Sequence, residues 1–351
     1  AYPYDSDDRV EEVDFVMTYL NKMLKDSLCL LLFGFFMILF LFAEKIKDIS
    51  FFNRFPSSFL NINTIFLSIV LEAIPFILLG VFVSAIIQAF VSENAIRKFL
   101  PRNAYLALIP AALLGVIFPI CECAIIPVVR RLIKKGMPAH VGVVFMLSAP
   151  ILNPVVYAST YFAFKSTPYI ANARMFAGFI SSIIIGLIIY RRFKGENILK
   201  TDNDIQHGHH HHHSSKRNKF LETLYHASDE LFDTGKYLFI GAFLASLFQT
   251  FLDRNVLLSI GTSPSLAPGV MMGFAYVLSV CSSADAFVAS SFGSTFTEGS
   301  ILAFLVFGPM IDIKNTLMLF GYFKKRFVLF LLMVTPVVVY LSVYIFQLIF
   351  I

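Results

Sequence analysis

Charged residues are scarce in this chain. Of its 351 residues only 15% are Asp, Glu, Lys or Arg, while 57% are hydrophobic. A soluble domain typically has roughly 25% charged and 45–50% apolar residues, so the scarcity of charge excludes that class. The apolar residues also gather in runs, several of them near the roughly 20 residues that a helix needs to cross a bilayer. The sequence therefore predicts an integral membrane protein.

Two catalytic signatures are missing as well. The chain has no G-x-x-x-x-G-K-[S/T] phosphate-binding loop, so we expect no ATP hydrolysis by that route. It also lacks the Cys-x-x-Cys spacing that a thiol–disulfide redox enzyme favours. We therefore predict a protein that is not an enzyme and needs no cofactor. We expect the lipid bilayer as its surroundings and no nucleic-acid partner.

Nine apolar segments are candidates for membrane spans or for parts of spans. Some are too short or too interrupted to cross as one straight helix, which predicts breaks within the membrane. The segments are Leu28–Ala43, Thr64–Val91, Ala104–Ile120, Val141–Phe164, Tyr169–Tyr190, Tyr237–Leu252, Val270–Val280, Ile301–Tyr322 and Phe327–Ile351.

The two halves of the sequence match each other. At shifts of 161, 160 and 159 residues, Gly80 falls on Gly241, Cys121 on Cys281, and Asn153 on Asp312. These three shifts differ by only one residue each, as expected for two copies of one unit with small gaps between them. We therefore predict two copies of one transmembrane unit, residues 61–194 and 220–351. Before them we expect an acidic soluble or amphipathic arm (1–27) and an extra transmembrane span with a loop (28–60). A His-rich linker (195–219) joins the copies.

Basic residues orient the two copies, because Lys and Arg collect in short cytoplasmic loops. The first copy has three basic clusters: Arg97/Lys98/Arg102, Arg130/Arg131/Lys134/Lys135 and Arg191/Arg192/Lys194. All three are cytoplasmic only if the piece Ala104–Ile133 enters the membrane and returns to the same side. In the second copy, residues 253–300 carry Arg254 as their single basic residue. We predict an all-α polytopic membrane protein with two inverted-topology repeats, each containing a broken or re-entrant helical hairpin, as in many secondary transporters.

The first predicted hairpin tip, FPICECAIIPVV, holds two thiols and a carboxylate. We place the tip at Pro119–Cys123 and begin a half-helix at Ala124, with Pro127 in or near its first turn. A helix N-terminus favours thiolates, the metal-binding form of cysteine. In an extended tip Cys121 and Cys123 face one way. Glu122 between them would bind a cation or relay a proton.

The second predicted tip, VCSSADAF, adds a third thiol. It supplies Cys281 and Asp285, together with Ser282 and Ser283, whose hydroxyls we expect to cap its half-helix. Two thiols from one tip and one from the other predict a soft three-sulfur site for Cu(I), Zn(II) or a trivalent metalloid. The alternative is that the cysteines are packing residues, since free Cys is often simply buried.

Further polar residues interrupt the apolar runs. Charges at membrane depth mark pathways or proton relays, and we assign Glu72, Asp233 and Lys314 to a relay. The alternative for Glu72 and Asp233 is a solvated position near the end of a span. Asn153 in SAPILNP and Asp312 in FGPMIDIKN predict matching kinked helices that present substrate-binding groups to the tips. Because Asp312 and Lys314 are two residues apart, we expect them on different helical faces, with Lys314 in the relay or extended toward the membrane surface.

The linker carries a histidine tract that is either a native metal-binding segment or an engineered tag. We expect it on the cytoplasmic side, where neutral imidazoles would bind metal. The histidines are His207, His209, His210, His211, His212 and His213.

Three segments resemble a family of predicted bacterial permeases that includes the trivalent organoarsenical efflux permeases. They are FPICECAIIPVVRRLIKKGMP, FMLSAPILNP and CSSADAFVASSF, and the resemblance runs from about Thr64 to the C-terminus. It implies a multi-pass permease of the bacterial cytoplasmic membrane with metal or metalloid cargo and with Cys121, Cys123 and, less directly, Cys281 as ligands. Arsenical members of that family often have Ser between the first two cysteines and Gly after them. Glu122 and Ala124 stand here instead, which together with the His-rich linker favours a divalent or soft metal cation.

Four functional hypotheses follow. The leading one is a secondary transporter, an efflux permease for a metal or metalloid species, coupled to protons through the carboxylates. The second is a permease for a thiol-reactive anion or sulfur compound held at the half-helix N-termini. The third is a membrane enzyme that uses Cys121 and Cys123 as a redox pair. The fourth is a non-transporting subunit that serves a partner; a homo-oligomer and a partner subunit both stay open.

Overall fold

The computed structural model describes residues 57–90, 101, 103–117, 120–200, 219–251, 266–293 and 295–350. The predicted N-terminal arm, most of the extra span and most of the His-rich linker lie outside these residues. The chain divides into two compact units, Ala1–Ser68 and Ile69–Ile351. In the first unit only residues 57–68 are described; they are helical, and the Ser68 hydroxyl donates to the Thr64 carbonyl at 2.8 Å.

The described residues form α-helices and contain no strand. The helices are α3 (Ser57–Phe90), α5 (Leu108–Ile117), α6 (Glu122–Lys134), α7 (Ala139–Leu152), α8 (Pro154–Ala163), α9 (Tyr169–Arg192), α10 (Lys219–Phe251), α12 (Ala267–Leu278), α13 (Asp285–Ser290), α14 (Glu298–Met310), α15 (Ile313–Tyr322) and α16 (Lys325–Phe350). Five stretches in this part of the chain are long and apolar enough to cross a membrane: Asn61–Ile87, Ala139–Ala163, Tyr169–Arg192, Glu298–Tyr322 and Lys325–Ile349. The predicted all-α polytopic class is confirmed.

The order of helices is duplicated. The first half contains α3 and α5–α9, and the second half contains α10 and α12–α16 in the same order. Helices α7 and α14 have 14 and 13 residues, and α8 and α15 have 10 each. The carbonyls of Cys121 and Cys281 also play the same role, because each accepts the N–H groups three and four residues ahead. The opposite membrane orientation of the two copies stays a prediction.

Each half contains two short helices where a hairpin is predicted, α5 and α6 in the first half and α12 and α13 in the second. Helices α5 and α12 have 10 and 12 residues, and at 1.5 Å per residue they span about 15–18 Å of a roughly 30 Å hydrocarbon layer. Helix α6 begins at Glu122, two residues before the predicted start at Ala124. Pro127 is therefore inside the helix rather than in its first turn, and it has no N–H to donate to the Cys123 carbonyl.

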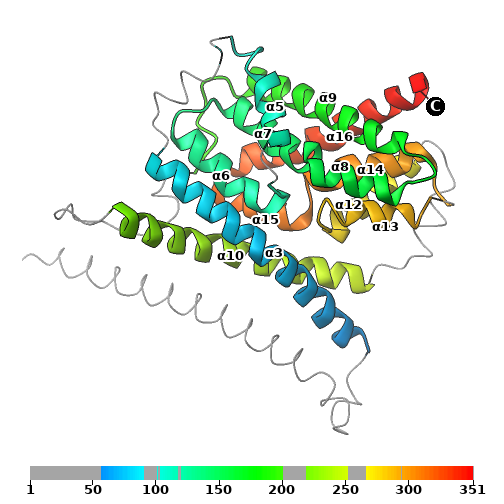
Figure 1. The fold of residues 1–351 in the computed structure, drawn as a ribbon, viewed down its shortest axis with the longest axis horizontal. Helices are drawn as coiled ribbons and strands as arrows, with labels where there is room; N and C mark the ends of the chain where they lie inside the picture. Colours follow the sequence, from blue (N-terminus) through cyan, green and yellow to red (C-terminus); the bar gives the residue numbers. More distant parts are fainter. Residues whose placement is uncertain are drawn as a thin grey trace, which may run out of the picture. The chain divides into compact units, whose positions relative to one another are not determined.

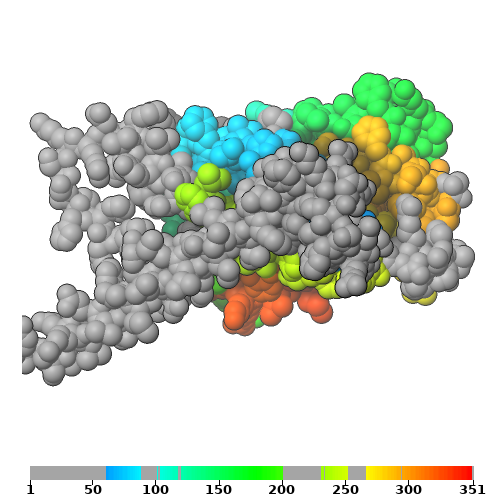
Figure 2. All heavy atoms as spheres, turned by 90° about the horizontal axis from the view of Figure 1, so that it is seen from below, coloured from blue at the N-terminus to red at the C-terminus, as the bar shows by residue number. Residues whose placement is uncertain are grey.

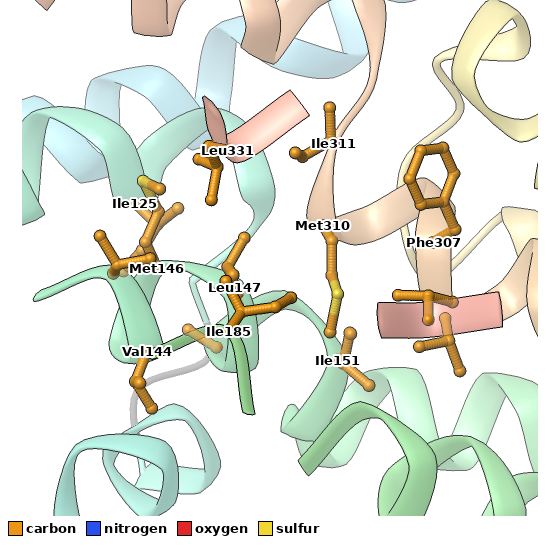
Figure 3. Packing of buried hydrophobic residues seen from close by; sticks show 14 of the residues in the cluster. Ile125, Val144, Met146, Leu147, Ile151, Ile185, Phe307, Met310, Ile311 and Leu331 are labelled. Atoms are coloured by element: carbon orange, nitrogen blue, oxygen red, sulfur yellow. The ribbon is translucent and has the colours of Figure 1, made fainter. Parts of the chain in front are cut away.

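Two kinked spans form the interior of the second unit. In the most apolar part of Ala139–Ala163 and of Glu298–Tyr322, 78% and 89% of the residues are buried, against 33% in Lys325–Ile349. Helix α7 packs on α5, α6, α9 and α14, and α14 packs in addition on α12, α13 and α16 (Figure 1). Side chains of both spans, among them Leu147 and Met310, meet in one apolar core (Figure 3). Less buried helices such as α16 leave apolar residues exposed, as lipid-facing helices do.

The breaks in these spans fall at the two predicted polar residues. Asn153 has an extended backbone between α7 and α8, and its Oδ1 accepts the Val155 N–H at 2.9 Å. Asp312 has the same role before α15, where its Oδ1 accepts the Asn315 N–H at 2.7 Å. Such side-chain caps satisfy donors that a helix start leaves without partners.

Each kinked span contacts the hairpin of the other half. Helix α8 of the first half packs against α13, and α15 of the second half packs against α6. Figure 2 shows the green side chains of α8 and α9 beside the gold side chains of α12 and α13. These contacts bring the helix breaks of the two halves toward one another, together with the polar residues at those breaks.

Two glycines allow long helices to pack directly on backbone near these breaks. A Cβ atom at Gly80 of α3 would lie 2.6 Å from the Cβ of Ala124, and one at Gly241 of α10 would lie 2.8 Å from the Cα of Lys314. Both distances are far below van der Waals contact, and the Lys314 neighbour is backbone that cannot rotate away. Gly273 of α12, by contrast, has no neighbour within 4 Å of such a Cβ.

We therefore predict opposite effects of the same substitution in two helices. Gly241→Ala should lower the free energy of unfolding by about 1–3 kcal/mol because it overpacks the α10–α15 contact. Gly273→Ala should be neutral or stabilising by up to about 1 kcal/mol, since Ala is the better helix former. Thermal unfolding of the detergent-purified protein, followed by far-UV circular dichroism, measures both. Equal midpoints for the two variants would contradict the close approach at Lys314.

Candidate functional site

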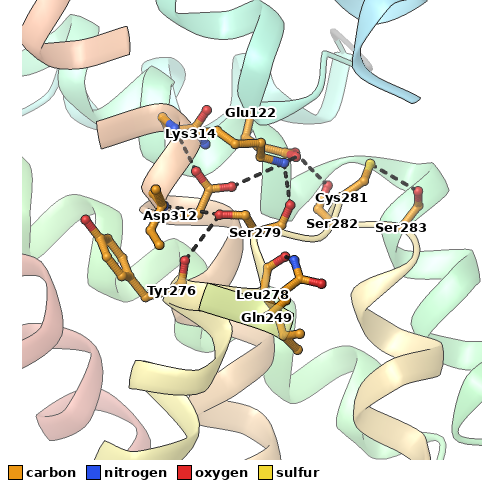
Figure 4. Close-up of polar contacts among 12 residues, drawn as sticks. Glu122, Gln249, Tyr276, Leu278, Ser279, Cys281, Ser282, Ser283, Asp312 and Lys314 are labelled. Atoms are coloured by element: carbon orange, nitrogen blue, oxygen red, sulfur yellow. Dashed lines mark hydrogen bonds and ion pairs between the residues drawn. The ribbon is translucent and has the colours of Figure 1, made fainter. Parts of the chain in front are cut away.

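A buried charged cluster lies where α15 packs on α6. Glu122 is the first residue of α6, Asp312 is the N-cap of α15, and Lys314 is the second residue of that helix. Their exposed fractions are 3%, 1% and 3%. Figure 4 shows the three side chains pointing toward one another beside the turn that follows α12. Charges from both halves of the chain are therefore enclosed together.

The ammonium group of Lys314 contacts every other member of this cluster. The Nζ of Lys314 donates to the Ser279 carbonyl at 2.5 Å and lies 3.4 Å from Oδ2 of Asp312 and 3.8 Å from Oε1 of Glu122. The expectation that Asp312 and Lys314 face apart is wrong, because α15 begins only at Ile313 and Asp312 has an extended backbone. Lys314 also does not extend toward the membrane surface, since its side chain is buried.

Ser279 connects the turn after α12 to α15. Its backbone is left-handed, with φ 49° and ψ 39°, and it is the one non-glycine residue with positive φ in the described part of the chain. Its hydroxyl oxygen accepts the Ile313 N–H at 3.2 Å, while its carbonyl accepts from Lys314. A left-handed Ser is uncommon and needs such surrounding contacts to persist. The sequence carries no signal for this residue.

The cluster borders a small cavity that also contains the predicted thiols. Cys121 and Cys123 from the first tip and Cys281 from the second line it, and all three are free and buried. The remaining lining residues are Ile69, Glu72, Ala73, Phe76, Glu122 and Lys314. Its volume of about 10 Å³ is about enough for a single water molecule. Glu72, from the middle of α3, is exposed elsewhere on its surface.

The thiols surround the cavity without forming a coordination sphere. Among the described residues, no three His, Cys, Asp or Glu side chains are arranged to hold a metal ion. The three-sulfur site therefore stays a prediction. The linker histidines, His207 and 209–213, lie outside the described residues.

The second tip reaches the cluster through its serines, although not as predicted. Helix α13 has Ala284 as its N-cap and no side-chain cap, so Ser282 and Ser283 do not cap it. The Cys281 carbonyl instead accepts the N–H groups of Ala284 and Asp285 at 2.9 Å each, which closes the turn with backbone alone. Ser282 Oγ lies 3.5 Å from Oε2 of Glu122, at the outer limit of a hydrogen bond, and Ser283 Oγ lies 3.5 Å from Sγ of Cys281.

Asp285 does not line the cavity but binds an arginine that the sequence interpretation missed. Arg174 of α9 is fully buried, and its Nη2 donates to Oδ2 of Asp285 at 2.7 Å and to the Ser282 carbonyl at 3.1 Å. Its Nη1 donates to Oγ1 of Thr160 at 2.8 Å. A lone Arg within the apolar run Tyr169–Tyr190 is an intramembrane charge, and the rule applied to Glu72 and Lys314 would have found it.

Comparison with known proteins assigns the chain to a family. A family model described as a predicted permease matches residues 58–348. The chain belongs to this predicted permease family. It is 54% identical over 287 residues to the UPF0718 protein YcgR of Bacillus subtilis (strain 168), covering 82% of this chain and 96% of that protein.

A second relative, from Streptococcus mutans, is named as a candidate subunit of a two-component membrane permease complex. It is 40% identical over 278 residues, which cover 79% of this chain and 92% of that protein. No solved structure matches the permease. Its family and its spans together establish a multi-pass membrane protein embedded in a lipid bilayer, and the family favours a transporter over an enzyme.

Two other predicted site residues of the permease have different surroundings. Asn153 is buried and caps α8, and it is not among the residues that line the cavity. Asp233 lies within α10, but its side chain is outside the described residues. From the predicted set the cavity thus joins the three cysteines with Glu72, Glu122 and Lys314. The predicted residues that do not line it are Asn153, Ser282, Ser283, Asp285 and Asp312.

Buried charge makes Lys314 a strong determinant of stability. We predict that Lys314→Ala lowers the free energy of unfolding by about 3–5 kcal/mol, because Glu122 and Asp312 keep their burial and lose their shared cation. Lys325→Ala, at the exposed first residue of α16, is the matched control and should change stability little. Far-UV circular dichroism during thermal unfolding in detergent provides the comparison.

A rescue variant tests the cause of this effect. Adding Glu122→Gln to Lys314→Ala removes one of the two carboxylates left without a cation, so part of the lost stability should return. A Lys314→Ala protein that unfolds at the same temperature as Lys325→Ala would contradict the buried cluster. A double variant less stable than Lys314→Ala alone would contradict the electrostatic explanation.

Proposed function

We propose that this permease is a secondary transporter that carries a soft metal cation or metalloid species past the cluster of Glu122 and Lys314, with Cys121, Cys123 and Cys281 as its ligands. The observation that supports this most is that thiols from both hairpin tips and the carboxylates of Glu72 and Glu122 line one cavity. Thiolate ligands select Cu(I), Zn(II) and similar soft ions over Mg or Ca. Substrate sites where two hairpins meet are also typical of transporters with broken helices.

The charge of the site supports a positively charged cargo. One ammonium, that of Lys314, is shared by the carboxylates of Glu122 and Asp312, and Glu72 lines the same cavity. When these groups are ionised, negative charge exceeds positive charge, so an entering cation gains favourable interactions that a neutral molecule does not. A cation beside Glu122 would take over part of the role of the Lys314 ammonium. The cavity is too small for a hydrated ion, so cargo entry requires the tips to separate.

Direction and coupling belong to the same proposal. We propose efflux coupled to protons through Glu72, Asp233 and the cluster carboxylates, because the chain has no phosphate-binding loop that would use ATP. We place the permease in the bacterial cytoplasmic membrane with the His-rich linker on the cytoplasmic side, following the basic clusters. The name of the Streptococcus mutans relative supports a partner subunit for this chain as well.

One observation favours a second candidate cargo. The Lys314 ammonium and the first turn of α6 border the same cavity as the thiols. A cation and the free N–H groups of a helix start attract anions. A thiol-reactive anion or sulfur compound would therefore fit the same place, held by Lys314 and not by the cysteines.

Binding to the purified protein separates these candidates. The full chain, with His207 and His209–His213 changed to Ala, is titrated in detergent with Zn(II), Cu(I), arsenite and thiosulfate. We expect one of the first three to bind, and Cys121→Ser/Cys123→Ser to weaken it by about 100-fold or more, equivalent to about 2.8 kcal/mol. Cys29→Ser, at a cysteine that precedes both matching halves in the sequence, is the matched control and should leave the affinity unchanged.

Two outcomes would contradict the soft-ligand site. The first is that none of the three soft species binds; the second is that the double serine variant binds as tightly as its parent. Thiosulfate binding that survives the loss of both thiols would support the anion candidate instead.

A further inference from the structure

The second hairpin tip is fixed by a buried ionic network that lies outside the cavity. Arg174 donates to Asp285, to the Ser282 carbonyl and to Thr160, and the exposed fractions of Arg174 and Asp285 are 0% and 2%. Arginine stays protonated in proteins and presents a planar fork of donors, so it can hold several acceptors at once. Burying such a charge is tolerated only with well-placed partners.

The network crosses from one half of the chain to the other. Arg174 and Thr160 belong to α9 and α8 of the first half, while Ser282 and Asp285 belong to the second tip. The packing of α8 on α13 brings them together. The tip is therefore anchored on the scaffold of the opposite half, and the anchor is a charge pair with two further hydrogen bonds.

The first tip is held differently. At the shift of 160 residues that aligns Cys121 with Cys281, the position of Asp285 corresponds to Ile125. Ile125 is buried in the apolar core, and Figure 3 shows it in the same packed cluster as Leu147 and Leu331. At this aligned position the first tip has apolar packing and the second tip has a carboxylate paired with arginine, so the arginine network is a specific feature of the second tip. The charge of the first tip, Glu122, contacts Lys314 instead.

Ser282 connects this anchor to the site. Its carbonyl accepts from Arg174, its hydroxyl points to Glu122, and its neighbour Cys281 lines the cavity (Figure 4). We propose that Arg174 is the positioning residue of the second tip: it fixes the backbone at Ser282 and thereby holds the Cys281 thiol at the cavity. The role of the Cys281 thiol as a ligand rests on the proposed function. The role of Arg174 in holding that thiol at the cavity does not.

Thiol labelling tests the proposal without any cargo. In full-length protein whose only cysteine is Cys281, the rate of N-ethylmaleimide labelling in native membranes reports how often the second tip opens. Arg174→Met should raise that rate about tenfold or more, equivalent to about 1.4 kcal/mol. Arg192→Met, at the exposed end of the same helix, is the matched control and should leave the rate unchanged.

A second single-cysteine protein tests whether the effect of Arg174→Met is confined to the second tip. In protein whose only cysteine is Cys121, Arg174→Met should leave the labelling rate unchanged, because the first tip is held by the packing of Ile125 and by the contact of Glu122 with Lys314, neither of which involves Arg174. An equal rise at Cys121 and Cys281 would show a general loosening of the fold and would overturn the proposal.

A double variant distinguishes positioning from stability alone. Arg174→Met/Asp285→Leu replaces the ion pair by apolar groups, which usually preserves stability or improves it. We expect the unfolding midpoint to return to the parent value while Cys281 labelling stays fast, since the Ser282 carbonyl still lacks its donor. If Cys281 in the double variant is labelled as slowly as in the parent protein, Arg174 contributes only to stability and the proposal is overturned.

A conservative variant covers the case in which Arg174→Met fails to fold. Arg174→Lys keeps the charge beside Asp285 but lacks the fork that also reaches Ser282, so it should give an intermediate rise in Cys281 labelling. Parent-like labelling with Lys would overturn the proposal. Loss of metal binding in the cavity would affect the proposed function without changing any of these rates, so the two failures are distinguishable.

Discussion

The ammonium group of Lys314 constrains parts of the chain that are far apart in sequence. It lies between Glu122 of the first half and Asp312 of the second, and it donates to the Ser279 carbonyl. A buried charge is tolerated only while its partners surround it, so α6, α15 and the turn after α12 must keep their relative positions. Gly241 contributes to the same arrangement, because a glycine there lets α10 pack directly on the backbone of Lys314. Lys314 also lines the cavity, so its contacts fix part of the cavity wall.

Helix breaks explain why the cavity lies where it does. In hydrocarbon each backbone group without a partner is costly, so broken helices are tolerated only where protein or enclosed water satisfies them. The breaks at Cys121, Ser279 and Asp312 meet this requirement through turn carbonyls, a serine hydroxyl and a carboxylate cap. Polar groups that complete broken helices are also the groups available to a substrate. A site at the meeting point of the two hairpins therefore arises from the same physics that permits the breaks.

Much of this arrangement is predictable from local signals. Proline and single polar residues inside apolar runs predict the interruptions at Asn153 and Asp312, because they either remove a backbone donor or supply a cap. The internal match of Cys121 with Cys281 correctly predicts two tips with the same backbone role. The membrane class follows from composition alone. In these cases the signal is a local residue, the match between the two halves, or the composition of the whole chain, and none of them requires knowing which side chains meet in space.

The remaining features depend on partners that local patterns do not identify. The contact of Asp312 with Lys314 depends on α15 beginning one residue after the carboxylate, and a boundary error of that size reverses the prediction. Arg174 is visible as a lone intramembrane charge, but its carboxylate is 111 residues away. Neutralising buried charge requires only that each cation meet an acid, and Glu122, Asp285 and Asp312 all qualify. Only the packing of α8 on α13 and of α15 on α6 decides which acid belongs to which cation. Both tips therefore line the cavity, but the second tip depends in addition on an arginine that lies outside it.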